Sequence, residues 1–511
     1  MLKQINRFAA SLSQSHHRSP QDIKTPTYSG IFISRNRLRQ PRYLLLSGMA
    51  AVVAVSCTQL NQTQLVTEEA APAGDEEAVL TVWWEKGFNL EEDEAMQNLV
   101  DAWQEDSNHM VDLSFYTTDD LLQKAQRAIQ AGNPPDILMS HNAERGLYPY
   151  QAWEGKLVDV SEIVEPLRTI YPPSILEAVY FYNNVEKKRS YYSVPFSQTT
   201  NFINYWSDFV EQAGFEDKAI PQDWDGFWNF WKQVQEQLPQ PQNQDTPVYG
   251  LGFSFSDKAA DTYLLFEQIL EAYDAQLVTP EGELQVEDPV VRQKIIQSLD
   301  WYAQFYQDGY LPMDTVNWLN PDNNGNLLNR AIVMTPNTSL TIPATVRKEA
   351  DVYQNQLSTI GFPDKPSGAP MRHILSIKQA VIFTDSENQD IAKEFLAYFV
   401  QPETVGNYLK AAGLRNMPIA KTIWEDPYWT NPDDPHIAKA AELLLSDNTR
   451  PFPSVYHPAY SIVTKENVWG QALNRMVTDD IAAEQAADDA IARITQIFDD
   501  FAAGDRPAVG E

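Results

Sequence analysis

The sequence predicts an α/β fold in which helices cover largely parallel sheets. Three observations carry this prediction. Short strand-like runs alternate with helical spacing over about 60 residues from Ala78, which is the βαβ pattern of such sheets. A second region of strands and helices starts after Val194 and Pro195. Finally, the roughly 430 residues that follow the N-terminal segment are long enough for two or three domains, each with its own core.

The first region begins with Val79–Trp84, a β-branched and aromatic run that suits a buried strand. Thr118 or Asp119 can cap the helix that follows the second strand, and Gly132 with Pro134 ends that helix. In a parallel sheet, ligands bind outside the carboxyl ends of the strands. We therefore expect a site where three loops meet, namely Glu85–Asn89, Thr117–Asp119 and Ser140–Arg145.

The second region repeats the alternation less regularly. Trp224, Trp228 and Trp231 are spaced four and three residues apart, which favours the core stripe of a helix over a binding site. A proline- and glycine-rich linker occupies residues 363–370. The expected strands are 202–205, 248–253, 331–335, 358–363 and 379–383, with a hairpin at 277–286 and helices at 224–234, 289–307, 437–445 and 482–498.

The only cysteine, Cys57, follows an apolar run, Tyr43–Ser56, that has a cluster of arginines ahead of it. This arrangement is typical of an export signal, and the run is shorter than the roughly 18 residues of a membrane span. Ala54-Val55-Ser56-Cys57 resembles the bacterial lipobox, which implies a lipid on Cys57; the alternative is a buried cysteine packed as a small hydrophobe. We expect residues 1–56 to be an export signal with an N-terminal extension, and residues 57–77 a flexible tether.

Charge and motif content exclude several function classes. Residues 1–57 hold eight of the 38 basic residues and one of the 70 acidic residues, so the remainder carries a formal charge of −39. Such a surface repels nucleic acid, and we expect no nucleic-acid partner. One cysteine permits no intrachain disulfide, and the seven histidines have no zinc-ligand spacing. We expect no metal, no cofactor and no catalytic residue, although paired carboxylates for glycoside hydrolysis stay open.

An ordered series of motifs resembles one family. From Leu80 to Phe498 the chain looks like an extracellular solute-binding protein of the maltodextrin-binding type, the receptor subunit of ABC importers. The motifs include Gly155-Lys156-Leu157-Val158-Asp159, Pro221-x-x-Trp224-x-x-Phe227, Asp308-Gly309-Tyr310-Leu311-Pro312 and Gly413-Leu414-Arg415-Asn416-Met417-Pro418.

The resemblance implies a two-lobe periplasmic-binding-protein fold of type II, whose lobes are joined by crossing strands and close on a ligand. The first lobe would comprise residues 78–195 and 373–412, and the second residues 196–370 and 413–498, with a tail at 499–511. Each crossing needs a hinge. Pro195 and the linker 363–370 are the candidates.

The segment Glu85-Lys86-Gly87-Phe88-Asn89 resembles the Asp-Lys-Gly-Tyr-Asn segment of maltodextrin receptors, in which the acid and the lysine bind sugar hydroxyls. A solvated loop with an ordinary charge pair is the alternative. Many relatives carry a Gly-Trp near Asn337, and this chain does not, which leaves Trp318 or Tyr460 as replacements for a stacking ring. The ligand contacts we expect are Trp84, Glu85, Lys86, Asn142, Gln198, Asn204, Asn337, Arg415 and Tyr460.

The resemblance implies an exported receptor, periplasmic or on the outer face of the cytoplasmic membrane, held there by lipid at Cys57. It would capture a small-molecule solute, a sugar, oligosaccharide or other polyol, and deliver it to a membrane permease. We expect a monomer. A lipid-anchored carbohydrate-active hydrolase and a stand-alone ligand-sensing binding protein are the alternatives.

Overall fold

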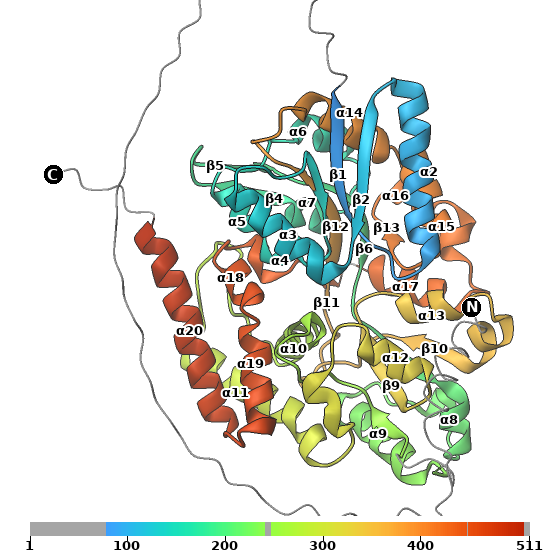
Figure 1. Cartoon of the computed structure of the whole chain (residues 1–511). Coiled ribbons are helices and arrows are strands. Elements are labelled where there is room, and N and C mark those ends of the chain that lie inside the picture. The colour runs from blue at the N-terminus through green and yellow to red at the C-terminus, as the bar shows by residue number, and fades with distance from the viewer. Residues whose placement is uncertain (1–77, 241–246, 447, 505–511) are drawn as a thin grey trace, which may run out of the picture. The chain divides into compact units, whose positions relative to one another are not determined.

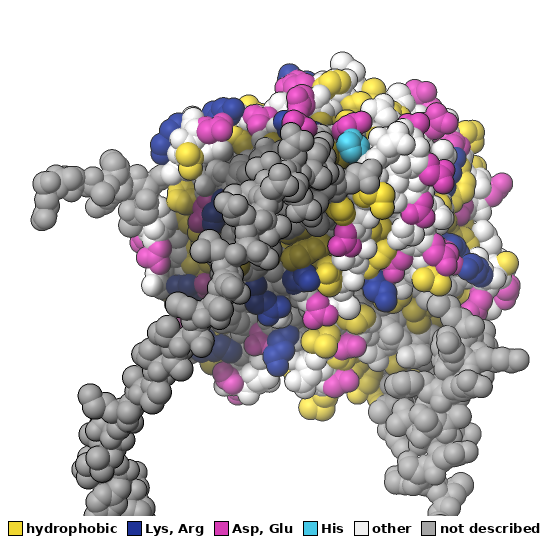
Figure 2. Space-filling view, turned by 45° about the horizontal axis from the view of Figure 1, so that its top comes forward, with side chains coloured by type: hydrophobic (Ala, Val, Ile, Leu, Met, Phe, Trp, Pro, Cys, Tyr) yellow, Lys and Arg dark blue, Asp and Glu magenta, His cyan; other side chains and the backbone are white. Residues whose placement is uncertain are grey.

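The computed structural model describes residues 78–240, 247–446 and 448–504. The predictions for Cys57, the export signal and the tether fall on residues outside this part of the chain. Within the described ranges, no helix combines the length and the apolar character needed to cross a bilayer. On the face in Figure 2, acidic and basic side chains are interspersed, with hydrophobic side chains scattered among them.

Two sheets organise the fold (Figure 1). The first sheet has the order β13-β6-β12-β3-β1-β2, with β13 at Met417–Pro418, β6 at Val194–Thr199, β12 at Ser376–Ile382, β3 at Ile137–Met139, β1 at Val79–Glu85 and β2 at Met110–Tyr116. The second has the order β10-β7-β9-β8, with β10 at Leu357–Ile360, β7 at Phe202–Trp206, β9 at Ile332–Asn337 and β8 at Tyr249–Leu251.

Strand direction is mixed in both sheets. In the first sheet β1 runs parallel to β2 and β3, as the βαβ pattern predicts. β12 runs antiparallel to β3 and β6, and in the second sheet only the β8–β9 pair is parallel. The α/β class is therefore confirmed, but the sheets are not largely parallel. The reason is that β6 and β12 enter the first sheet as strands that lead to or from the second sheet, not through βαβ crossovers.

Helices cover these sheets, and most expected helices are present. The helix after β1 runs from Leu90 to Ser107, and the hairpin predicted at 277–286 is reduced to a bridge between Val278 and Leu284. The helices of the first sheet's side are α2 (Leu90–Ser107), α3 (Thr118–Gln130), α4 (Ala143–Gly146), α5 (Tyr148–Trp153), α6 (Ser161–Val164), α7 (Pro173–Ala178), α14 (Gln389–Phe399), α15 (Pro402–Ala411), α16 (Lys421–Trp424) and α17 (Pro435–Leu444). The others are α8 (Ser207–Gln212), α9 (Trp224–Gln237), α10 (Ala260–Ala272), α11 (Pro289–Gln307), α12 (Asp322–Leu328), α13 (Thr341–Val346), α18 (Tyr460–Lys465), α19 (Val468–Thr478) and α20 (Ala483–Gly504).

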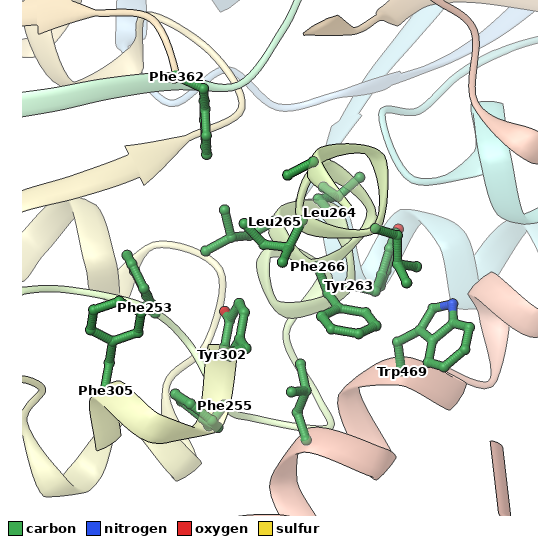
Figure 3. Close-up of a cluster of buried hydrophobic side chains, with 14 of the residues drawn as sticks. Phe253, Phe255, Tyr263, Leu264, Leu265, Phe266, Tyr302, Phe305, Phe362 and Trp469 are labelled. Carbon is green, nitrogen blue, oxygen red and sulfur yellow. The ribbon is translucent and has the colours of Figure 1, made fainter. Parts of the chain in front are cut away.

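An aromatic core fixes the helices around the second sheet. Trp224, Trp228 and Trp231 on α9 are at most 3% exposed, which confirms the predicted core stripe. Figure 3 shows the centre of this core, where α10 places Phe266 between Tyr302 and Trp469. Burial of such side chains contributes about 1.5–3 kcal/mol each. This packing holds α10 in place and thereby fixes the position of its first turn.

Three segments of the described chain cross between the sheets. The first is the short link between β6 and β7, and the second runs from β10 through β11 (His373–Ile374) to β12. The third carries β14 (Thr449–Arg450), which pairs in parallel with β11. The Thr200 hydroxyl donates to the Ile374 carbonyl at 2.9 Å. The crossings are therefore hydrogen-bonded to one another.

A separate two-stranded pair is formed by β4 (Tyr180–Asn183) and β5 (Lys188–Tyr191).

The packing of residues 417–444 bears on where the lobes divide. β13 pairs with β6 of the first sheet. Ile423, Trp424 and Leu444 belong to the same hydrophobic cluster as β1 and α2, whereas Phe452 and Tyr460 belong to the cluster around α10. We propose that the first lobe also includes residues 417–444, so that the third crossing lies near β14 and not at residue 413.

Candidate functional site

A cavity of about 330 Å³ opens between the two sheets. The three loops predicted from the strand ends all line it. They do so through Glu85–Phe88, through Thr117 and Thr118, and through His141, Asn142 and Arg145. The opposite wall comes from the second sheet and its helices, including Asp261, Asn324 and Asn337. Its volume lies at the lower end of the roughly 300–1,000 Å³ of small-molecule sites. The structure therefore brings together polar groups from both sheets around a space for a compact ligand.

Glu85, the last residue of β1, is bound from three sides. Its Oε1 accepts from the Thr118 hydroxyl at 2.8 Å and lies 2.7 Å from His141 Nδ1. Its Oε2 accepts from the Ser140 hydroxyl at 3.3 Å and from the His141 backbone N–H at 2.7 Å. Burial alone would raise the pKa of Glu85, but His141, Arg415 and Lys378 outweigh burial and hold that pKa at about 2. Glu85 is ionised at neutral pH, and its oxygens are engaged by the protein.

His141 is the partner that Glu85 orients. Burial lowers the pKa of His141 to about 4, and the nearby Lys378 and Arg415 act in the same direction against Glu85. The ring is therefore neutral at pH 7, with its proton on Nδ1 toward Glu85. A neutral imidazole that donates through Nδ1 keeps Nε2 as an acceptor. His141 thus adds an uncharged acceptor to the wall.

Two basic side chains on the same wall share one acid. Arg145 Nη2 lies 2.7 Å from Glu144 Oε1, and Lys378 Nζ lies 3.7 Å from the same oxygen. Ser376 links the group, since it contacts Arg145 and donates to Glu144 at 2.6 Å. Burial lowers the pKa of Lys378 to about 8. Arg145 also lowers this pKa, whereas Glu144 raises it. Because Arg145 and Lys378 share one carboxylate, some of their N–H groups are available to donate to a ligand in the cavity.

Arg415 completes this wall from the turn after α15. Its Nη1 lies 3.2 Å from Glu92 Oε2, and its Nη2 lies 3.4 Å from His141 Nδ1. No described residue accepts a hydrogen bond from its buried Nε. A buried donor without a partner has a free-energy cost of about 1–3 kcal/mol unless a ligand or water satisfies it.

Asp261 faces these cations from the first turn of α10. Its backbone N–H donates to Asn320 Oδ1 at 3.2 Å. No described side chain or backbone N–H donates to its carboxyl oxygens, although Arg145 and Arg415 interact with it electrostatically. Burial raises the pKa of Asp261 to about 7, against the opposing effect of both arginines.

Residues 98–439 match the family described as bacterial extracellular solute-binding protein. The chain belongs to this family. A search of curated proteins found no match for this solute-binding protein.

Solved structures share its two-lobe fold at low sequence identity. An ABC transporter solute-binding protein from Thermotoga lettingae, bound with α-D-tagatose, is 18% identical over 82% of this chain and 99% of that one, with a TM-score of 0.68. A sugar transporter from Arthrobacter chlorophenolicus with bound laminaribiose is 14% identical over 82% and 99%, with a TM-score of 0.65. UgpB from Mycobacterium tuberculosis, in complex with glycerophosphocholine, is 17% identical over 83% and 99%, also at 0.65.

The cavity of this solute-binding protein holds five of the nine ligand contacts that the sequence predicts. Glu85 lies in its wall with both oxygens engaged by the protein, and Lys86 is the exposed cation beside it. The other three are Asn142, Asn337 and Arg415.

Four predicted contacts lie outside the cavity. Trp84 is 2% exposed and packs on Phe196 and Phe399, because alternation along β1 turns it into the core. Gln198 is buried and donates to the Pro418 carbonyl at 2.8 Å. Asn204 accepts from the Thr359 hydroxyl in the second sheet at 2.9 Å, and Tyr460 is 1% exposed and contacts Glu267. These four buried side chains pack or form hydrogen bonds within the protein interior.

Asp261 and Lys378 are lining residues for which the sequence has no recognisable signal. Asp261 follows two alanines at a helix start, and Lys378 sits within an otherwise ordinary strand. His141 and Arg145 lie in a loop that the strand ends do predict, although neither is among the individual residues expected there. Asn320, Pro321 and Asn324 also contribute to the cavity wall, and none of them is among the residues expected from the sequence.

Proposed function

We propose that this protein is the extracytoplasmic receptor of an ABC importer, that it captures a sugar, short oligosaccharide or related polyol, and that it delivers the solute to a membrane permease. The observation that carries the proposal is the cavity itself, where hydrogen-bonding groups from both sheets surround about 330 Å³. The sugar-bound solved structures with the same fold support it.

Capture would work by closure of the two lobes. Donors on the first sheet's side, such as Arg145 and Arg415, and acceptors on the second, such as Asp261, contact one solute together only when the lobes are close. A ligand that touches both lobes stabilises the closed form in proportion to its extra contacts there. The three crossing segments would serve as the hinge, and the closed form would be the one that the permease receives.

We also propose that the receptor is a monomer on the outer face of the cytoplasmic membrane or in the periplasm, anchored by lipid at Cys57. The order of arginine cluster, apolar run and cysteine supports this placement. One acyl chain binds membranes reversibly, so stable anchoring needs more than one chain. Mass spectrometry of the mature N-terminus is expected to find an acylated Cys57; an unmodified thiol or another first residue would contradict the anchor.

A thermal-shift screen tests the receptor function. At a ligand concentration 100-fold above Kd, binding to the folded state alone adds about 2.7 kcal/mol of stability and raises the unfolding midpoint. We expect at least one neutral sugar or polyol to do this, with polyamines and amino acids as comparison ligands. Failure of every sugar and polyol would contradict the proposal. The solute should also be recovered intact after long incubation, because continued cleavage would favour the hydrolase alternative.

A further inference from the structure

Among the described residues, Phe88 is the only Phe, Tyr or Trp that lines the cavity, and this side chain is 42% exposed at its mouth. The described part of the wall therefore has no buried ring on which a sugar could stack. The three aromatic candidates from the sequence, Trp84, Trp318 and Tyr460, are all buried at 3% exposure or less. Sugar sites that bind successive pyranose rings use aromatic faces against their C–H sides. In this cavity, selectivity must come from hydrogen bonds and charge.

The charged groups around the cavity nearly cancel. Arg145 and Lys378 share Glu144, and Arg415 pairs with Glu92, so these three cations meet two acids behind them. Lys86 and the ionised Glu85 add one charge of each sign, and Asp261 on the opposite side supplies the fourth negative charge when it is ionised. Unlike the acids behind the wall, Asp261 has no protein donor on its carboxyl among the described residues. Its acceptor oxygens are free for a solute.

Asp261 is also held in place before any solute binds. The rest of α10 from Thr262 onward is buried, and Figure 3 shows Phe266 packed between Tyr302 and Trp469. A group fixed by the core loses little conformational entropy on binding, so its contacts contribute more to affinity.

We propose that Asp261 binds the solute directly, by accepting hydrogen bonds from its hydroxyl groups, and that the cavity selects a compact, neutral, hydroxyl-rich solute over an anionic one or a long stacked oligosaccharide. This inference rests on the proposed receptor function. Arg145, Lys378 and Arg415 would donate to the solute's oxygens from the other lobe. An added anionic group would be repelled by Asp261 and Glu85, while the cations opposite already have acidic partners.

Isothermal titration of the full mature chain tests the inference. The probes are neutral mono- and disaccharides, the matched uronic acids and a longer maltodextrin. Hydrogen bonds to a charged group are strong, so Asp261→Asn is expected to weaken binding of the best neutral sugar by about 10- to 100-fold. Asp257→Asn, at an exposed acid four residues earlier, is the matched control and should bind as the unaltered chain does.

The pH profile separates direct binding from a structural role. Because the pKa of Asp261 is about 7, the carboxylate that accepts hydroxyls forms as the pH rises, and affinity should increase about tenfold or more from pH 5.5 to 7.5. His141, with a pKa of about 4, and Lys378, with a pKa of about 8, titrate mainly outside this window. Burial also raises the pKa of Glu267 on α10 to about 7, but Glu267 does not line the cavity. Asp261→Asn should therefore lose most of the pH dependence of binding.

Several results would overturn the inference. Unchanged affinity in Asp261→Asn, or a pH dependence that persists in this variant, would contradict direct binding by Asp261. Tighter binding of a uronic acid or of the long maltodextrin would contradict the proposed selectivity. Neither result would contradict the receptor function. If the unaltered chain binds no sugar at all, the receptor function fails as well. Thermal unfolding of Asp261→Asn should show a folded protein, since the change removes a charge that is costly to bury.

Discussion

Glu85→Ala is expected to lower the free energy of unfolding by about 3–5 kcal/mol and to abolish solute binding. The reason is that Glu85 is 3% exposed and receives the Thr118 and Ser140 hydroxyls, the His141 backbone N–H and the His141 ring. Its removal would leave these groups without an acceptor and would release His141 from its orientation. Urea unfolding and titration with the solute found by the screen measure the two effects.

Glu85→Gln sharpens the test. The amide keeps the size of the side chain but replaces one acceptor oxygen with a donor that faces the His141 ring. We expect a smaller loss of stability than in Glu85→Ala and a clear loss of affinity. Glu94→Gln, an exposed acid on α2, is the control and should change stability by less than about 0.5 kcal/mol. Full stability and affinity in Glu85→Ala would show that this network does not hold the site together.

The contrast between Glu85 and Asp261 explains how much of the site the sequence predicts. The three loops at the ends of β1, β2 and β3 follow from strand order alone, because the carboxyl ends of parallel strands meet at one edge. The sequence therefore leads to Glu85, Lys86 and Asn142. It does not reveal that the donors to Glu85 come from three separate positions, which only the folded arrangement of Thr118, Ser140 and His141 supplies.

The wall opposite Glu85 is formed by distant parts of the chain, and its residues are therefore harder to predict from the sequence. Asp261 is one of 70 acids and carries no motif, and its importance comes from facing Arg145 and Arg415 across the cavity. The aromatic residues differ from their predicted roles for a related reason. Tyr460 is a plausible stacking ring by sequence, but its hydroxyl contacts Glu267 in a fully packed interior. Side-chain direction at such positions is decided by tertiary packing.

The crossing segments are also only partly predictable from the sequence. Composition predicts the linker 363–370, but it does not predict which side chains bind this linker. Glu271 on α10 and the neighbouring Asp274 hold this linker, because Glu271 Oε1 and Asp274 Oδ1 each lie 2.6 Å from Lys365 Nζ. Glu271 also binds Arg372, next to β11, through contacts of 2.8 and 3.0 Å, and Arg450 of β14 at 2.6 Å. One carboxylate thus ties the second and third crossings to the second lobe.

Glu271→Gln is expected to cost about 3–5 kcal/mol of folding stability, because it removes the buried negative charge that these three cations share. Glu271 is 4% exposed; burial alone would raise its pKa, but Arg450, Arg372 and Lys365 hold it at about 2. The stabilisation from this carboxylate is present above the usual pKa of 4.5 and is lost as the pH falls toward 2. The variant should therefore lose less stability on acidification than the unaltered chain, as measured by urea unfolding at pH 3 and pH 7.

Glu466→Gln is the matched control, since the Glu466–Arg493 pair lies on the surface, where such pairs contribute about 1 kcal/mol or less. Because Glu271 does not line the cavity between the two sheets, its loss should leave each solute contact intact and act through the hinge. Small-angle scattering with and without solute should then record a change in how far the lobes close. If Glu271→Gln is as stable as the unaltered chain at pH 7 and loses as much stability between pH 7 and pH 3, then other contacts hold Lys365, Arg372 and Arg450.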